Sequence, residues 1–173
     1  MMIQPIPDFP ALPICSLRDP PLKGPFAVLT EARSDEAALE CLSRHFGTNL
    51  VTSEVWRNVL PGSGVLISSA ISGGTLEGRF RHAAAACPQR CWLLVEPISE
   101  RFPLPCLTGI GTPIPVSDHS PAFYSEALCC MYTHAVRDGT ATLTLWDTEE
   151  TLRRKLELAK AAGFLGYTVR LSG

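Results

Sequence analysis

Short apolar runs alternate with helical patterns along most of this chain, and this alternation limits the fold more than any other feature. The runs that we expect to form strands are 26–30, 49–53, 64–70, 91–97, 140–146 and 166–171. Strands that alternate with helices usually build a mainly parallel sheet with helices packed over it. The sequence therefore predicts an α/β fold with about six strands.

The N-terminal segment differs from the rest of the chain. Residues 1–25 hold seven prolines, which predict an extended arm, because proline fixes φ and lacks a backbone donor. Residues 26–173 are long enough for a single α/β domain with its own core. Within it, residues 98–120 hold four prolines and predict a long loop or small insertion. Residues 121–136 predict a helix with proline in its first turn.

The closing segment predicts a helix followed directly by a strand. Asp147 stands where an N-cap belongs and Glu150 follows three residues later, which is the capping-box arrangement. Leu152 and Leu156 recur at helical spacing and should face the core. Lys155 is expected on the exposed side, among the charged residues of this helix.

Charge and composition exclude several classes of protein. The net charge is −2 and no basic run occurs, so the electrostatic footprint of a nucleic-acid-binding protein is missing. No signal peptide or long apolar run is present, which predicts a cytoplasmic protein without membrane insertion. The seven cysteines form an odd set without zinc-ligand spacing, and no dinucleotide or Walker motif occurs. We therefore expect no metal and no cofactor.

Candidate site residues follow from the rule that α/β sheets bind ligands at the carboxyl ends of their strands. Glu96 ends a strongly apolar strand and could act as a general acid, form an ion pair with Arg170, or lie in solvent. Asp147 could supply a second carboxylate, although its place before a helix fits a capping role better. Ser68 lies at a third strand end and could bind a ligand.

Tryptophans are the second group of candidates. Trp92 and Trp146 could form a platform on which a sugar ring stacks, or they could belong to the core or to an interface.

The closing stretch "WDTEETLRRKLELAKAAGFLGYTVRL" resembles the end of family 18 glycoside hydrolases, especially their spore-germination and cortex-lytic branch. In that family a helix of the kind "K-x-x-L-A-K-x-x-G" precedes the eighth barrel strand. "RCWLLVEPISERFPLP" is similar to the family's seventh strand and its exit, and "GVLISSAISGGTLEGRFRHAAAACP" to the sixth strand and its helix. The resemblance covers roughly residues 64–173. It implies a TIM-barrel-like fold, incomplete or truncated here because such barrels typically need about 250 residues.

Three parts of that family's catalytic site are missing from this sequence. The string "D-x-x-D-x-D-x-E", whose glutamate protonates the leaving oxygen, does not occur. The "M-x-Y-D" of the sixth strand is absent, and Arg170 stands where the family has a substrate-facing tryptophan. These departures argue against the family's hydrolase chemistry and favour a degenerate relative, a pseudoenzyme.

Three functions stay open at this point. The favoured one is a non-catalytic domain for carbohydrate binding or assembly, linked to the spore or cell wall by the resemblance alone. The second is a small glycoside hydrolase with a remodelled carboxylate site that uses Glu96 and Asp147. The third is a structural homo-oligomer without a ligand, because an incomplete barrel leaves strand edges that the proline-rich arm or a homodimer partner must cover.

Overall fold

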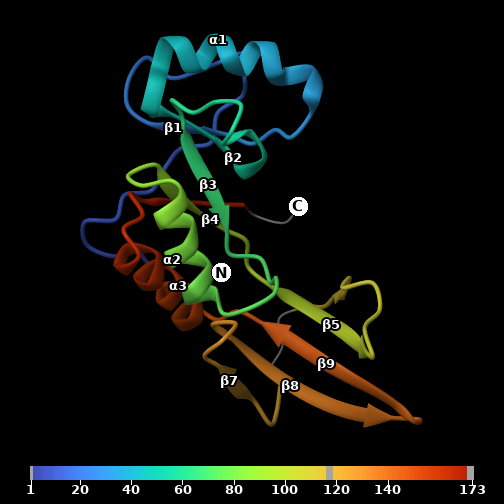
Figure 1. Cartoon of the computed structure of the whole chain (residues 1–173). Coiled ribbons are helices and arrows are strands. Elements are labelled where there is room, and N and C mark those ends of the chain that lie inside the picture. The colour runs from blue at the N-terminus through green and yellow to red at the C-terminus, as the bar shows by residue number, and fades with distance from the viewer. Residues whose placement is uncertain (1, 116–118, 171–173) are drawn as a thin grey trace.

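The computed structural model describes residues 2–115 and 119–170, and these residues form two five-stranded sheets (Figure 1). The first sheet is parallel and curled, with the order β1-β2-β3-β4-β10. Its strands are β1 (Phe26–Val28), β2 (Leu50–Ser53), β3 (Gly64–Ser68), β4 (Cys91–Val95) and β10 (Tyr167–Val169). The predicted α/β class and incomplete, TIM-barrel-like sheet are thus confirmed.

Three α-helices cover one face of the parallel sheet. They are α1 (Glu36–Phe46), α2 (Leu76–Ala86) and α3 (Glu149–Ala161). Short 3-10 turns flank α1 and β2, namely η1 (Arg33–Asp35), η2 (Gly47–Asn49) and η3 (Glu54–Trp56). The expected cap of α2 is present, because the Thr75 side chain accepts a hydrogen bond from Gly78 N.

Successive side chains of each strand point to opposite faces of the parallel sheet, and this divides the core into two layers. Leu39 of α1 packs with Phe26 and Leu50, while Phe80 of α2 and Leu156 of α3 pack in a larger cluster that also holds residues of β3, β4 and β10. The other face carries a separate apolar cluster, formed by Leu12, Ala27, Val51, Leu66, Trp92 and Leu94. The helices therefore pack on one side, and a residue of the N-terminal arm packs on the other.

The proline-rich arm joins the two edges of the parallel sheet. Leu12 N donates to Tyr167 O at 2.7 Å, which attaches the arm to β10. Three residues further on, Cys15 N donates to Ala27 O at 2.8 Å, which attaches the arm to β1. Leu12 itself is only 5% exposed. A short segment of arm thus covers both edges that the sequence left open, and it does so within one chain.

The second sheet is antiparallel and is inserted between β4 and α3. Its strands, in spatial order, are β6 (Thr112–Pro113), β5 (Ser99–Leu104), β9 (Thr140–Trp146), β8 (Cys130–Arg137) and β7 (Phe123–Ser125). Figure 1 shows it projecting away from the helices. The strand predicted at 140–146 exists, but it belongs to this sheet and not to the parallel one. Part of the predicted loop 98–120 also pairs here, as β5 and β6.

The prediction of a helix over residues 121–136 is wrong. Residues Phe123–Ser125 and Cys130–Arg137 are the strands β7 and β8, joined by a turn in which Cys129 has a φ of 53°. The apolar residues of this segment also fit a strand pattern once β9 is available as a partner. β9 pairs with β8 from Met131 to Arg137. Pairing with a neighbouring strand outweighs local helix propensity here, as it often does in sheets.

Among the described residues, no helix is both long and apolar enough to cross a membrane. The last predicted strand, 166–171, is present as β10 up to Val169, and its final residue lies outside the described residues.

Candidate ligand-binding site

The carboxyl ends of β3 and β4 bring Glu96 and Ser68 together. The two strands are paired in parallel, with Ser68 opposite Leu94, so the residues that follow them emerge at the same edge. The Ser68 hydroxyl donates to Glu96 Oε2. Glu96 N donates in turn to Ser69 Oγ at 2.9 Å. Two successive serines therefore fix both the backbone and the side chain of Glu96.

Arg170 completes this cluster from the next strand. Its Nη1 lies 3.3 Å from Glu96 Oε1, and its backbone N donates to Val95 O at 2.9 Å. The Arg170 side chain is 55% exposed and that of Glu96 is 26% exposed. The ion pair therefore lies at the surface, where a ligand can reach both charges.

Arg79 of α2 supports the loop that carries the serines. Its guanidinium donates to Ser68 O at 3.0 Å and to Ala70 O at 2.7 Å. Burial lowers the pKa of Arg79 from its ordinary value, and the charge of Glu54 opposes this effect. Arg79 acts by holding the backbone in place, and its helical position gave no sign of this role in the sequence.

Asp147 lies outside this cluster and is fully buried. Its Oδ2 accepts from Lys155 Nζ at 2.7 Å and from Ile98 N at 2.9 Å. Its Oδ1 accepts from the Thr151 hydroxyl at 2.7 Å. Neither oxygen is accessible to a ligand in this structure, so Asp147 is not positioned to share a cleft with Glu96.

The capping role expected of Asp147 belongs to its neighbour. Thr148 is the N-cap of α3, and it exchanges hydrogen bonds with Thr151, which completes a capping box. Glu150 takes no part in that box. Lys155, which was expected on the exposed side, is 1% exposed because it reaches inward to Asp147.

Both candidate tryptophans are buried. Trp92 is 6% exposed and packs between the arm and the strands, close to Gly64 and Gly166. Trp146 is 5% exposed, and its ring centroid lies 4.7 Å from that of His119. As the side chains stand in this structure, neither ring offers an open face for stacking.

Electrostatically, the cluster of Ser68, Glu96 and Arg170 is a compact set of opposite charges with hydroxyl donors. It can accept hydrogen bonds through a carboxylate and donate them through a guanidinium, which suits a ligand rich in hydroxyl groups. No second carboxylate bonds to Glu96 among the described residues. Nor do they contain a group of three or more histidine, cysteine or acidic side chains arranged to hold a metal ion.

A curled parallel half-barrel with an antiparallel insertion before its last helix and strand defines the class of this protein. Neither a protein-family model nor a curated protein matches the sequence. Among solved structures, the chain is similar to the spore cortex-lytic enzyme SleL of Bacillus cereus, with a TM-score of 0.56 and 14% identity. That alignment covers 86% of this chain and 45% of the enzyme.

Two further structures give the same result. The spore cortex-lytic enzyme SleL of Bacillus megaterium QM B1551 aligns with a TM-score of 0.53 and 9% identity, over 83% of this chain and 44% of that enzyme. The putative sporulation-specific glycosylase YdhD of Bacillus subtilis aligns with a TM-score of 0.53 and 12% identity, over 83% and 64%. The chain spans less than half the length of either SleL enzyme. At such low identity these likenesses show the fold alone, an α/β half-barrel like part of those enzymes.

Proposed function

We propose that this chain is a glycan-binding domain without hydrolase activity, associated with the spore or the cell wall. The observation that carries the proposal is the state of Glu96, whose two oxygens are held by Arg170 and Ser68. A general acid must reach a leaving oxygen, whereas both oxygens of Glu96 already have partners within the cluster. The same pair can bind sugar hydroxyls without any chemistry.

The burial of Asp147 supports the same conclusion. Glycoside hydrolysis by two carboxylates needs both groups to face one cleft, about 5–9.5 Å apart. Asp147 is 0% exposed and neutralised by Lys155, which leaves Glu96 without the partner that the sequence suggested. The fold shared with spore cortex-lytic enzymes supplies the link to spores and cell walls.

A binding assay with purified protein tests this proposal. We expect retention on insoluble cell-wall material and chitin, and measurable binding of soluble N-acetylglucosamine oligomers by calorimetry. Arg170→Met and Glu96→Gln should each weaken binding by about tenfold, which corresponds to about 1.4 kcal/mol. Arg44→Met, at an exposed position of α1 that lines neither the cluster nor the groove described below, is the control for loss of a surface arginine.

Release of reducing ends from the same substrates distinguishes the hydrolase alternative. Activity that Glu96→Gln abolishes would replace the binding proposal with a remodelled hydrolase. Absence of binding to every glycan, together with a dimer in light scattering, would favour the structural homo-oligomer.

A further inference from the structure

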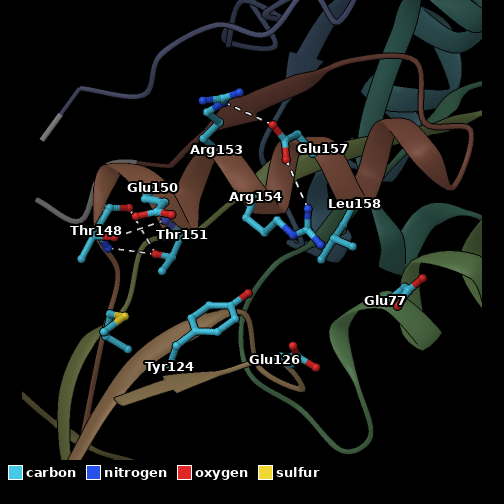
Figure 2. A pocket seen from close by; sticks show the side chains of 11 residues that line it. Glu77, Tyr124, Glu126, Thr148, Glu150, Thr151, Arg153, Arg154, Glu157 and Leu158 are labelled. Carbon is cyan, nitrogen blue, oxygen red and sulfur yellow. Dashed lines mark hydrogen bonds and ion pairs between the residues drawn. The ribbon is translucent and has the colours of Figure 1, made fainter. Parts of the chain in front are cut away.

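A groove beside α3 contains an exposed aromatic ring that the carboxyl-edge cluster lacks. The groove has a volume of about 660 Å³, within the range of about 300–1,000 Å³ that is usual for ligand sites. It is formed by the first turns of α3, the strand β7 with the turn that follows, and the start of α2 (Figure 2). Ser68, Glu96 and Arg170 are not among the residues that line it.

Tyr124 forms the floor of this groove. Tyr124 is 44% exposed, and Met131, opposite it in the β7–β8 ladder, extends the apolar surface. The Tyr124 hydroxyl lies 3.5 Å from the Sγ of Cys129, which is fully buried. Because one end of the ring is held in this way, a ligand that stacks on it costs little side-chain conformational entropy.

Burial and the bond to Cys129 raise the pKa of Tyr124 to about 12, so the ring stays a neutral phenol at physiological pH. Arg154 and Glu126 line the groove together with Tyr124 (Figure 2). The floor is therefore a neutral aromatic surface with one donor and one acceptor group beside it.

The rim of the groove carries more carboxylates than guanidinium groups, namely four glutamates and two arginines. Glu157 is shared by Arg153 Nε at 3.2 Å and Arg154 Nη1 at 3.5 Å, which compensates its charge. Glu126 and Glu150 are exposed and make no ion pair within the described part of the chain. Carboxylates accept from hydroxyl groups and a guanidinium donates to them, so the rim suits a ligand with many hydroxyls around an apolar ring face.

We propose that this groove is a second glycan-binding site, in which a pyranose ring stacks on Tyr124 while Arg154 and Glu126 bind its hydroxyls. The choice of a glycan rests on the proposed function, whereas the location of the site rests on the groove itself. A ligand that extends beyond one ring reaches Glu150 at the start of α3 and Glu77 at the start of α2, both of which line the groove.

Neighbouring residues of β7 give a matched pair of variants. Tyr124 and Phe123 are 44% and 41% exposed, but successive strand residues point to opposite faces of the sheet. Tyr124→Ala should weaken binding of an N-acetylglucosamine tetramer by about tenfold or more, as loss of a stacking ring does. Phe123→Ala should leave binding within about twofold. Tyr124→Phe, which keeps the ring, should restore most of the binding.

The outcomes separate this inference from the proposed function. Binding that falls with Arg170→Met but not with Tyr124→Ala would overturn the groove and keep the glycan-binding function. Equal effects of Tyr124→Ala and Phe123→Ala would also overturn the groove, since only one of these rings lines it. Binding of a lysine-rich peptide instead of any glycan, lost with Tyr124→Ala, would overturn the ligand class.

Discussion

Lys155 Nζ lies 2.7 Å from Asp147 Oδ2, and the two side chains are 1% and 0% exposed. This buried pair connects the end of β9 with the second turn of α3. Asp147 Oδ2 also accepts from Ile98 N, just before β5 begins. One carboxylate therefore fixes the junction where the antiparallel insertion leaves the parallel sheet and returns to it.

Removing the cation from this junction should lower the free energy of unfolding. Lys155→Met leaves the charge of Asp147 buried without its partner, and such changes typically destabilise a protein by about 3–5 kcal/mol. Arg153→Met is the control, because its ion pair with Glu157 is exposed and should contribute less than about 1 kcal/mol. Urea unfolding followed by circular dichroism measures both. Equal losses for the two variants would contradict a stabilising role for the buried pair.

Two glycines should respond differently to the same substitution. A Cβ on Gly166 would lie 2.6 Å from Trp92 Cζ3 and also too close to Pro10 O, so Gly166→Ala must displace the arm or the indole. Overpacking of this kind costs about 1–3 kcal/mol. A Cβ on Gly62 meets nothing within 4 Å, and Gly62→Ala should be nearly neutral. Thermal unfolding of both variants tests the close packing of the arm, and equal melting temperatures would argue against it.

The arm should contribute to the core through Leu12. Leu12→Ala removes a side chain that is 5% exposed, and losses of this kind cost about 2–5 kcal/mol. Leu22→Ala, at a position that is fully exposed, should change the unfolding free energy by less than about 0.5 kcal/mol. Limited proteolysis should cut the arm faster in Leu12→Ala than in Leu22→Ala. Identical cleavage rates would show that the arm does not depend on this contact.

Buried thiols should make the fold sensitive to alkali. Burial raises the pKa values of Cys91 and Cys130 from 9.0 to about 12. In the unfolded chain these thiols lose their protons near pH 9, whereas in the folded chain they keep them until about pH 12. The unfolding free energy should therefore fall as pH rises from about 9 towards 12, because the unfolded state then binds fewer protons.

Thiol labelling at pH 8 provides the direct measurement. Cys41 is exposed and should react at once with a thiol reagent, whereas Cys91 and Cys130 should react only on unfolding. Rapid modification of Cys91 or Cys130 in the native protein would contradict their burial.

Sequence patterns predicted the parallel sheet well because its strands are buried on both faces. In β3, residues 65–67 are continuously apolar and follow a glycine, and β4 is apolar throughout and lies between Arg90 and Glu96. The helix prediction for residues 121–136 was wrong because the apolar residues of this segment fit both the helical and the strand period. Only the pairing with β9 decides between them. Local pattern carries no information about a partner that lies elsewhere in the chain.

At the candidate site, the sequence offered the pairing of Glu96 with Arg170 as one of several alternatives, but it gave no sign of the burial of Asp147. The first follows from two neighbouring strand ends in a parallel sheet. The second depends on Lys155, whose place among exposed charges of α3 concealed that its long side chain turns inward. Tyr124 was missed as a candidate because the predicted helix placed it on no strand at all.

The hydrogen bonds of the arm have a consequence for the order of folding. Residue 11 bridges residue 167, so nearly the whole chain separates two segments that lie side by side. Contacts between such distant residues form late, because a long loop must close first. The parallel sheet can close only when residues 11–15 have reached both β10 and β1. Until the arm is in place, the outer edges of β1 and β10 present unpaired backbone groups with which another chain can pair.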